Sequence, residues 1–82
     1  MRRKVVVRKI NKNLCVTCTT KITDTGRTKY DVEVVEVQSD GWEEIKDSVY
    51  NCSNKDFANR KYSEYYSKWK NRVEEESKDG NK

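Results

Sequence analysis

One segment, SNKDFANRKYSEYYSKWKNRVEEE at residues 53–76, determines how the rest of the chain must pack. Its apolar and aromatic residues recur every three or four positions, which is the spacing of one face of an α-helix. The members of this face are Ala58, Tyr62, Tyr65, Trp69 and Val73, with Phe57 and Tyr66 at its margins. A helix with so aromatic a face needs a surface to cover, and the preceding residues are expected to form a β-sheet that provides it.

The beginning of this helix carries residues suited to an N-terminal cap. Ser53 can accept a hydrogen bond from the helix backbone, and Asp56 follows three residues later as the carboxylate of a capping box. Cys52 and Phe57 have the spacing of a hydrophobic staple. We therefore predict a helix over residues 53–76 and a frayed tail over residues 77–82.

Two strands and a hairpin are predicted before the helix. Residues 5–10 are β-branched, and residues 14–23 alternate strictly between apolar and polar side chains. The loop Asp24-Thr25-Gly26 suits a three-residue hairpin with the glycine in the left-handed conformation. Pairing across this loop matches the apolar faces of the two flanking strands. The expected pairs are Thr23 with Arg27, Thr20 with Tyr30, Cys18 with Val32, and Val16 with Val34.

The alternation changes phase in the third strand, where Val35 and Val37 are out of step with Val34. One extra residue near Val34 and Val35, a β-bulge, would return both sets to one face. A turn at residues 39–41 then leads to a fourth strand at residues 42–50. The spacing of Trp42, Ile45 and Val49 in that segment also suits a short helix. The predicted fold is therefore α+β: an antiparallel meander of three to four strands with one long C-terminal helix packed on one face, in a single domain over residues 1–76.

Composition limits the classes of protein that the chain can belong to. No apolar run approaches the roughly 20 residues needed to span a bilayer. The first ten residues lack the apolar core of a signal peptide, and three cysteines do not suit a disulfide framework. We expect a cytoplasmic protein, in the host cytoplasm if the chain is viral, that does not bind membranes.

Several sites of catalysis are excluded or disfavoured by the residue types. The chain has no histidine and only three glycines, which removes histidine-based catalysis, histidine zinc sites and glycine-rich phosphate loops. Cys15 and Cys18 have the spacing of a redox or metal motif. On a strand, however, residues three apart point to opposite faces and lie roughly 10 Å apart. We therefore expect no enzyme activity, no cofactor, no metal and no disulfide.

The charges are divided between segments. Residues 1–12 carry six basic side chains and no acid, whereas residues 31–49 carry seven acids and one lysine. The acidic segment would complement a basic channel on a protein partner. The residues predicted to bind that partner are Glu33, Glu36, Trp42, Glu43, Glu44 and Asp47, with the tryptophan as an aromatic anchor.

Nucleic acid is the alternative partner. Basic and threonine side chains fall on one predicted sheet face, and such a face can enter the major groove of DNA. The residues are Arg3, Arg8, Lys9, Thr17, Thr19, Lys21, Arg27 and Lys29. A strand meander followed by a helix is also similar in architecture to the small DNA-binding domains of some phage-type integrases and plant transcription factors. A structural homodimer, joined at a sheet edge or at the exposed face, is a third possibility.

In size, in its lack of catalytic residues and in its divided charge, the chain resembles small phage-encoded accessory and inhibitor proteins, anti-CRISPR proteins among them. That resemblance implies a non-enzymatic inhibitor or accessory protein that binds a nucleic-acid-handling protein. We take this as the principal hypothesis, ahead of direct nucleic-acid binding.

Overall fold

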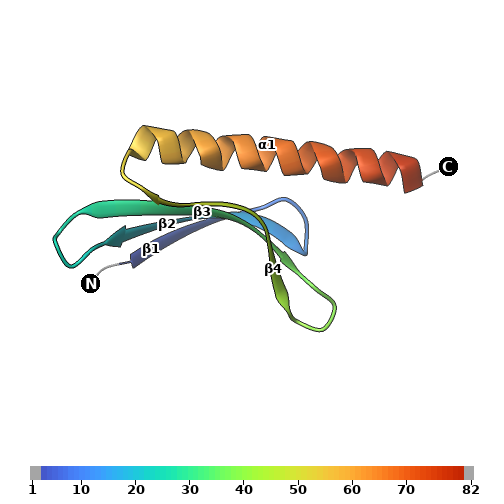
Figure 1. The fold of residues 1–82 in the computed structure, drawn as a ribbon. Helices are drawn as coiled ribbons and strands as arrows, with labels where there is room; N and C mark the ends of the chain where they lie inside the picture. The colour runs from blue at the N-terminus through green and yellow to red at the C-terminus, as the bar shows by residue number, and fades with distance from the viewer. Residues whose placement is uncertain (1–2, 81–82) are drawn as a thin grey trace.

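A four-stranded antiparallel sheet and one long helix form the two layers of the protein (Figure 1). The computed structural model describes the backbone of residues 3–80 and the side chains of residues 3–75. The elements are β1 (Arg3–Lys9), β2 (Leu14–Ile22), β3 (Thr28–Val37), β4 (Glu43–Cys52) and α1 (Lys55–Gly80). The strand order is β1-β2-β3-β4, which confirms the predicted meander and shows that residues 43–52 form a strand.

The β2–β3 hairpin has the predicted register. Val16 lies opposite Val34, Cys18 opposite Val32, and Thr20 opposite Tyr30. The Thr23 N–H donates to the carbonyl of Arg27 at 2.8 Å, which closes the three-residue loop. Gly26 has a φ of 81°, a conformation that costs glycine little because it has no Cβ. The prediction succeeds because the turn residues and the apolar alternation specify the same pairing.

The predicted bulge is present but belongs to the neighbouring strand. The β3–β4 pairing shifts between Val34, opposite Asp47, and Val35, opposite Ile45, so the additional residue is Lys46 of β4. Since β3 keeps an unbroken register with β2, Val35 remains on the sheet face that points away from the helix. The prediction that Val35 and Val37 would turn toward the helix is therefore wrong.

The core lies between the sheet and the helix. Its buried members are Leu14, Val16, Val32, Val34, Cys52 and Ala58. The predicted aromatic face of α1 packs against them with partly buried side chains, namely Phe57, Tyr62, Tyr65, Tyr66 and Trp69, followed by Val73. The helix thus buries its aromatic stripe while its charged face stays exposed, which is the expected behaviour of an amphipathic helix.

The helix begins two residues later than predicted. Asn54, rather than Ser53, is the cap, because its Oδ1 accepts a hydrogen bond of 3.0 Å from the N–H of Phe57. The helical backbone continues to Gly80, beyond the predicted end at Glu76. Residues 81 and 82 of the predicted tail lie outside the described residues, and fraying of the tail stays a prediction.

The helix covers the sheet unevenly. It packs against β2, β3 and β4, whereas all seven residues of β1 are exposed. The opposite face of the sheet, called here the outer face, has no second layer among the described residues (Figure 1). Over the same part of the chain, α1 lacks the uninterrupted apolar length that crossing a lipid bilayer requires.

Candidate interaction surfaces

Trp42 stands at the tip of the β3–β4 hairpin. The turn is closed by the N–H of Gln38, which donates to the Trp42 carbonyl at 2.7 Å. The Trp42 N–H donates in turn to Oδ1 of Asp40 at 3.0 Å, which fixes the backbone beside the ring. The side chain is 72% exposed, so the predicted aromatic anchor is available to a partner.

Several carboxylates lie on the two strands that lead to the turn at Trp42. Glu36 and Glu44 are cross-strand neighbours, as are Val37 and Glu43. Lys46 lies 3.5 Å from a Glu36 carboxylate oxygen and 3.2 Å from one of Glu44, and the hydrogen bond to Glu44 raises the pKa of this lysine. Glu43 has no ion pair among residues 3–75. We call this segment, residues 36–46, the acidic hairpin; it contains Glu36, Trp42, Glu43 and Glu44 of the predicted site.

The bulge at Lys46 changes the direction of the acidic hairpin. Bulges bend a strand and increase its local twist. In Figure 1 the far ends of β3 and β4 turn away from the helix and project from the sheet. The exposed indole and its surrounding acids are therefore carried on a protrusion rather than on a flat face.

The other two predicted acids lie elsewhere. Asp47 faces the helix, where Oδ2 accepts hydrogen bonds from Lys68 Nζ at 2.9 Å and from Trp69 Nε1 at 3.4 Å. The Lys68 contact lowers the pKa of Asp47. Glu33 lies on the outer face and accepts a 2.6 Å hydrogen bond from the Tyr50 hydroxyl, which raises the pKa of that tyrosine. The six predicted residues therefore do not form one surface.

Most of the basic and threonine residues of the alternative site share the outer face. Alternation along paired β1, β2 and β3 brings together Arg3, Lys9, Thr17, Thr19, Lys21 and Lys29. Arg8 belongs to the opposite face, where its guanidinium lies 3.8 Å from the centre of the Tyr66 ring. Arg27 lies outside the strands, in the β2–β3 turn.

Acids reduce the charge of this outer face. Lys21 forms an ion pair of 3.0 Å with Asp31, its diagonal neighbour on β3, which lies opposite Thr19. Glu33 lies on the same face beside Thr17. Apolar area is added among the charges by exposed side chains, including Val5 and Val7. The face is therefore mixed in character, rather than continuously basic.

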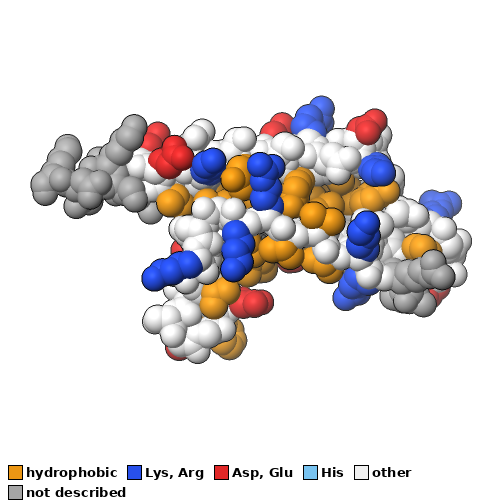
Figure 2. Space-filling model, turned by 180° about the vertical axis from the view of Figure 1, so that it is seen from behind, with side chains coloured by type: hydrophobic (Ala, Val, Ile, Leu, Met, Phe, Trp, Pro, Cys, Tyr) orange, Lys and Arg blue, Asp and Glu red, His pale blue; other side chains and the backbone are white. Residues whose placement is uncertain are grey.

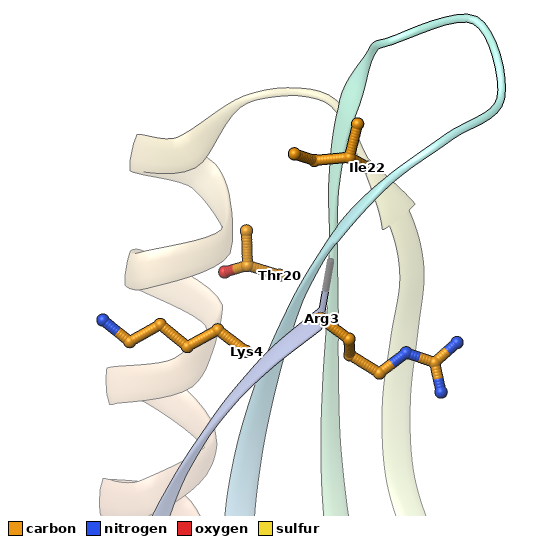
Figure 3. Close-up of a pocket in the computed structure, with 4 residues that line it drawn as sticks. All are labelled: Arg3, Lys4, Thr20 and Ile22. Atoms are coloured by element: carbon orange, nitrogen blue, oxygen red, sulfur yellow. The ribbon is translucent and has the colours of Figure 1, made fainter. Parts of the chain in front are cut away.

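The sequence analysis placed Arg3, Arg8 and Lys9 in the alternative site but did not single out β1 as the exposed edge of the sheet. Its side chains alternate between the two sheet faces: Figure 3 shows Lys4 extending toward the helix side and Arg3 extending away from it. Lys4 also lines an opening on the helix side, which has a volume of about 420 Å³. Arg3 of β1 and Thr20 and Ile22 of β2 complete its lining. Figure 2 shows hydrophobic side chains in a band beneath the helix, with lysine and arginine side chains around it. The sequence feature that could have indicated this edge is the symmetric order of residues 3–9, RKVVVRK.

The thiols are separate, as the strand spacing predicted. Cys15 and Cys18 occupy opposite faces of β2, and Cys52 is buried in the core. Burial raises the pKa of both Cys15 and Cys18, so neither is an activated thiolate at neutral pH. Among the residues that the structure describes, no group of three or more cysteine, aspartate or glutamate side chains is arranged to hold a metal ion.

Comparison with models of known protein families, with curated protein sequences and with solved structures gave no match to the chain.

Proposed function

We propose that the chain is a small non-enzymatic binding protein that inserts its acidic hairpin into a basic site of a protein partner. The observation that carries this proposal is the position of Trp42, 72% exposed at the tip of a projecting hairpin and flanked by carboxylates. Tryptophan is frequent at the energetic centre of interfaces because it buries a large area on binding. Acidic residues around it would speed association with a basic surface.

The conformation of the acidic hairpin is also fixed before a partner binds. Its turn is fixed by backbone hydrogen bonds and by the Asp40 contact to the Trp42 N–H. Gln38 donates to both Glu36 and Glu44, each at 3.1 Å, and so holds the two carboxylates in place. A partner would therefore bind a largely preorganised segment, which reduces the conformational entropy lost on binding.

The specific form of the proposal is an inhibitor or accessory protein of a nucleic-acid-handling partner, in the cytoplasm, as in the phage-type proteins that the sequence resembles. A basic channel that accommodates phosphates is a suitable receptor for the carboxylates of the acidic hairpin. Occupying that channel would exclude nucleic acid by competition.

Direct nucleic-acid binding is the second candidate. The observation in its favour is that six of the eight predicted residues share the outer face. The ion pair between Lys21 and Asp31 and the carboxylate of Glu33 would both oppose phosphate on that face. The homodimer is placed third, because the basic residues of β1 would oppose pairing of two copies at that edge, and the exposed apolar residues of the outer face are interspersed with charged ones.

One pair of substitutions separates the first two candidates. Glu43→Lys with Glu44→Lys reverses the charge of the hairpin, and Asp24→Lys with Glu64→Lys makes the same change of charge at exposed positions away from it. Each protein is immobilised and exposed to nuclease-treated lysate. In parallel, its binding to a labelled 20-base-pair DNA duplex is measured at two salt concentrations.

The proposal predicts that a protein from the lysate binds to the original chain and to the Asp24/Glu64 control. The same protein should not bind to the Glu43→Lys/Glu44→Lys variant or to the Trp42→Ala variant. Direct nucleic-acid binding predicts the opposite sign: the hairpin lysines would tighten binding to the duplex, and Arg3→Glu with Lys9→Glu, both on the outer face, would abolish it. Tighter duplex binding by the hairpin variant, with every protein contact retained, contradicts the proposed function.

A further inference from the structure

A second candidate surface is the free edge of β1, on the side of the strand away from β2. This strand pairs with β2 alone among the described residues, and all seven of its residues are exposed. An open strand edge presents N–H and C=O groups that are unpaired at every second residue, and these can pair with an incoming extended chain. Because α1 packs over β2, β3 and β4, the helix leaves this edge accessible.

The charge pattern of β1 disfavours pairing with itself. Its sequence is symmetric about Val6, with valine on both sides and a pair of basic residues beyond each valine. Two copies joined antiparallel around Val6 would place Arg3 opposite Lys9 and Lys4 opposite Arg8 in both halves. Like charges directly opposite each other destabilise a strand pair.

The free edge of β4 is also a poor partner for β1. β4 carries acids, but its pairing with β3 is interrupted by two register shifts. At the second shift Asn51 adopts a φ of 58°, outside the extended range of a regular strand. Such irregularities prevent a continuous ladder with another strand. A second copy of the chain therefore does not supply a suitable occupant.

On the helix side, β1 borders a groove that can receive side chains. The groove has a volume of about 220 Å³. Val6, Tyr30 and Tyr62 contribute apolar surface, while Lys4 and Lys55 contribute positive charge. The opening of about 420 Å³ shown in Figure 3 shares Lys4 and Thr20 with this groove. Toward the other end of β1, Arg8 stacks on Tyr66 and provides a second positive group.

We propose that the β1 edge binds an acidic, extended segment of a partner protein, which joins the sheet as a fifth strand. Backbone hydrogen bonds would provide affinity, and alternate side chains would provide selectivity. On the helix side these side chains would meet Lys4, Val6 and Arg8 in turn. Lys4 and Arg8 are four residues apart, about 13 Å along a strand. The preferred segment is thus acidic–x–apolar–x–acidic.

The inference goes beyond the proposed function because it assigns a second surface at the opposite edge of the sheet from β4. Nucleic acid is less suited to this edge than a peptide. Phosphates would satisfy the basic groups, but they would leave the strand's backbone groups unpaired and would place charge beside Val5, Val6 and Val7. An acidic peptide satisfies all three kinds of group at once.

The test uses a labelled full-length chain and the acetylated, amidated heptapeptide Thr-Glu-Thr-Ile-Thr-Glu-Thr. Amide chemical shifts are followed during titration, and amide exchange of β1 is measured with and without peptide. We expect shifts confined to β1 and the groove, with at least tenfold slower exchange at alternate β1 residues. The matched control peptides are Thr-Lys-Thr-Ile-Thr-Lys-Thr and a reordered Thr-Thr-Glu-Glu-Ile-Thr-Thr, both expected to bind at least tenfold more weakly.

Charge variants test the same contacts from the protein side. Lys4→Glu with Arg8→Glu should reverse the preference, so that the lysine peptide binds more tightly than the acidic one. Lys12→Glu with Arg60→Glu, at exposed positions away from the groove, should retain the original preference. If the reversal variant does not fold, Lys4→Gln with Arg8→Gln should fold and should reduce the difference between the two peptides severalfold.

Three results would overturn the inference: equal binding of acidic and lysine peptides, shifts centred on the acidic hairpin, or a DNA duplex that shifts the β1 amides while the acidic peptide does not. Dimerisation through β1 in sedimentation experiments would likewise overturn it in favour of a second copy. These outcomes leave the Trp42 capture assay unaffected, so failure here is distinguishable from failure of the proposed function.

Discussion

The guanidinium of Arg8 stacks on the ring of Tyr66, with 3.8 Å between the guanidinium carbon and the ring centre. This contact joins the exposed edge strand to the helix, on a flank where the helix otherwise packs mainly on β2, β3 and β4. Lys70 approaches the same ring, at 5.5 Å. Tyr66 therefore orders cationic groups beside β1 as well as contributing to the aromatic layer.

Replacing this ring should loosen β1 more than it destabilises the domain. Tyr66→Leu keeps an apolar side chain but removes the cation–π contact, which contributes about 0.5–1 kcal/mol at an exposed site. We expect a loss of about 1 kcal/mol in the free energy of unfolding and faster amide exchange throughout β1. Tyr50→Leu, which alters an exposed tyrosine on the outer face, serves as the control. Unchanged exchange in β1 would contradict the proposed role of the stacking contact.

The two tryptophans should differ in their effect on stability. Trp69 packs against the core and donates to Asp47, whereas Trp42 is 72% exposed. Trp69→Ala should cost about 2–4 kcal/mol, near the lower end for aromatic truncation because the side chain is only partly buried. Trp42→Ala should cost less than about 0.5 kcal/mol. Urea unfolding followed by circular dichroism gives both values, and similar costs would show that Trp69 is not an anchor.

The corrected helix cap gives a third expectation. Asn54→Ala should lower the free energy of unfolding by about 1 kcal/mol, because the N–H of Phe57 loses its acceptor. Ser53→Ala removes only an exposed contact from Lys29 and should have a smaller effect. A larger effect at Ser53 in thermal unfolding would restore the cap predicted from the sequence.

Stability should depend on pH through Asp47. Its pKa is lowered in the folded protein, mainly by the hydrogen bond from Lys68, relative to an ordinary value of about 3.9. The carboxylate therefore stabilises the fold fully above about pH 5, and this contribution is lost as the pH falls through the lowered pKa. Asp47→Asn should be less stable than the original chain at pH 7, and the difference should shrink toward pH 3. Glu64→Gln is the control, and a difference that is constant with pH would rule out this linkage.

The sequence was sufficient where local and non-local signals agreed. The Asp24-Thr25-Gly26 turn and the alternation of β2 specify one register, and the structure has that register. A register shift was correctly predicted at Val34 and Val35, but it arises from Lys46 of β4, and the alternation of β3 itself is unbroken, so Val35 faces away from the helix. The cap was misplaced because Ser53 and Asn54 are both good caps and only the backbone geometry selects one.

The candidate surfaces were harder to predict because charges are neutralised by distant residues. Asp47 and Lys68 are 21 positions apart and meet only when the helix packs on the sheet. Glu33 also accepts a hydrogen bond from a distant residue, the Tyr50 hydroxyl 17 positions along the chain, although this contact brings no opposite charge. A count of acids along the chain therefore overestimates the free negative charge, and the region around Trp42 stays a prediction. The exposure of β1 depends on which strands the helix covers, and a periodic pattern does not contain that information.

The small core has a consequence for the fate of the protein in a cell. Only six residues form the buried cluster, and the outer face adds no second layer among the described residues. A partner at 100 times its Kd would add about 2.7 kcal/mol to the stability of such a domain. Since proteases act on transiently unfolded chains, the unbound protein should be degraded faster than the bound one. Its abundance would then follow that of its partner, so turnover measured with and without the partner would report occupancy in vivo.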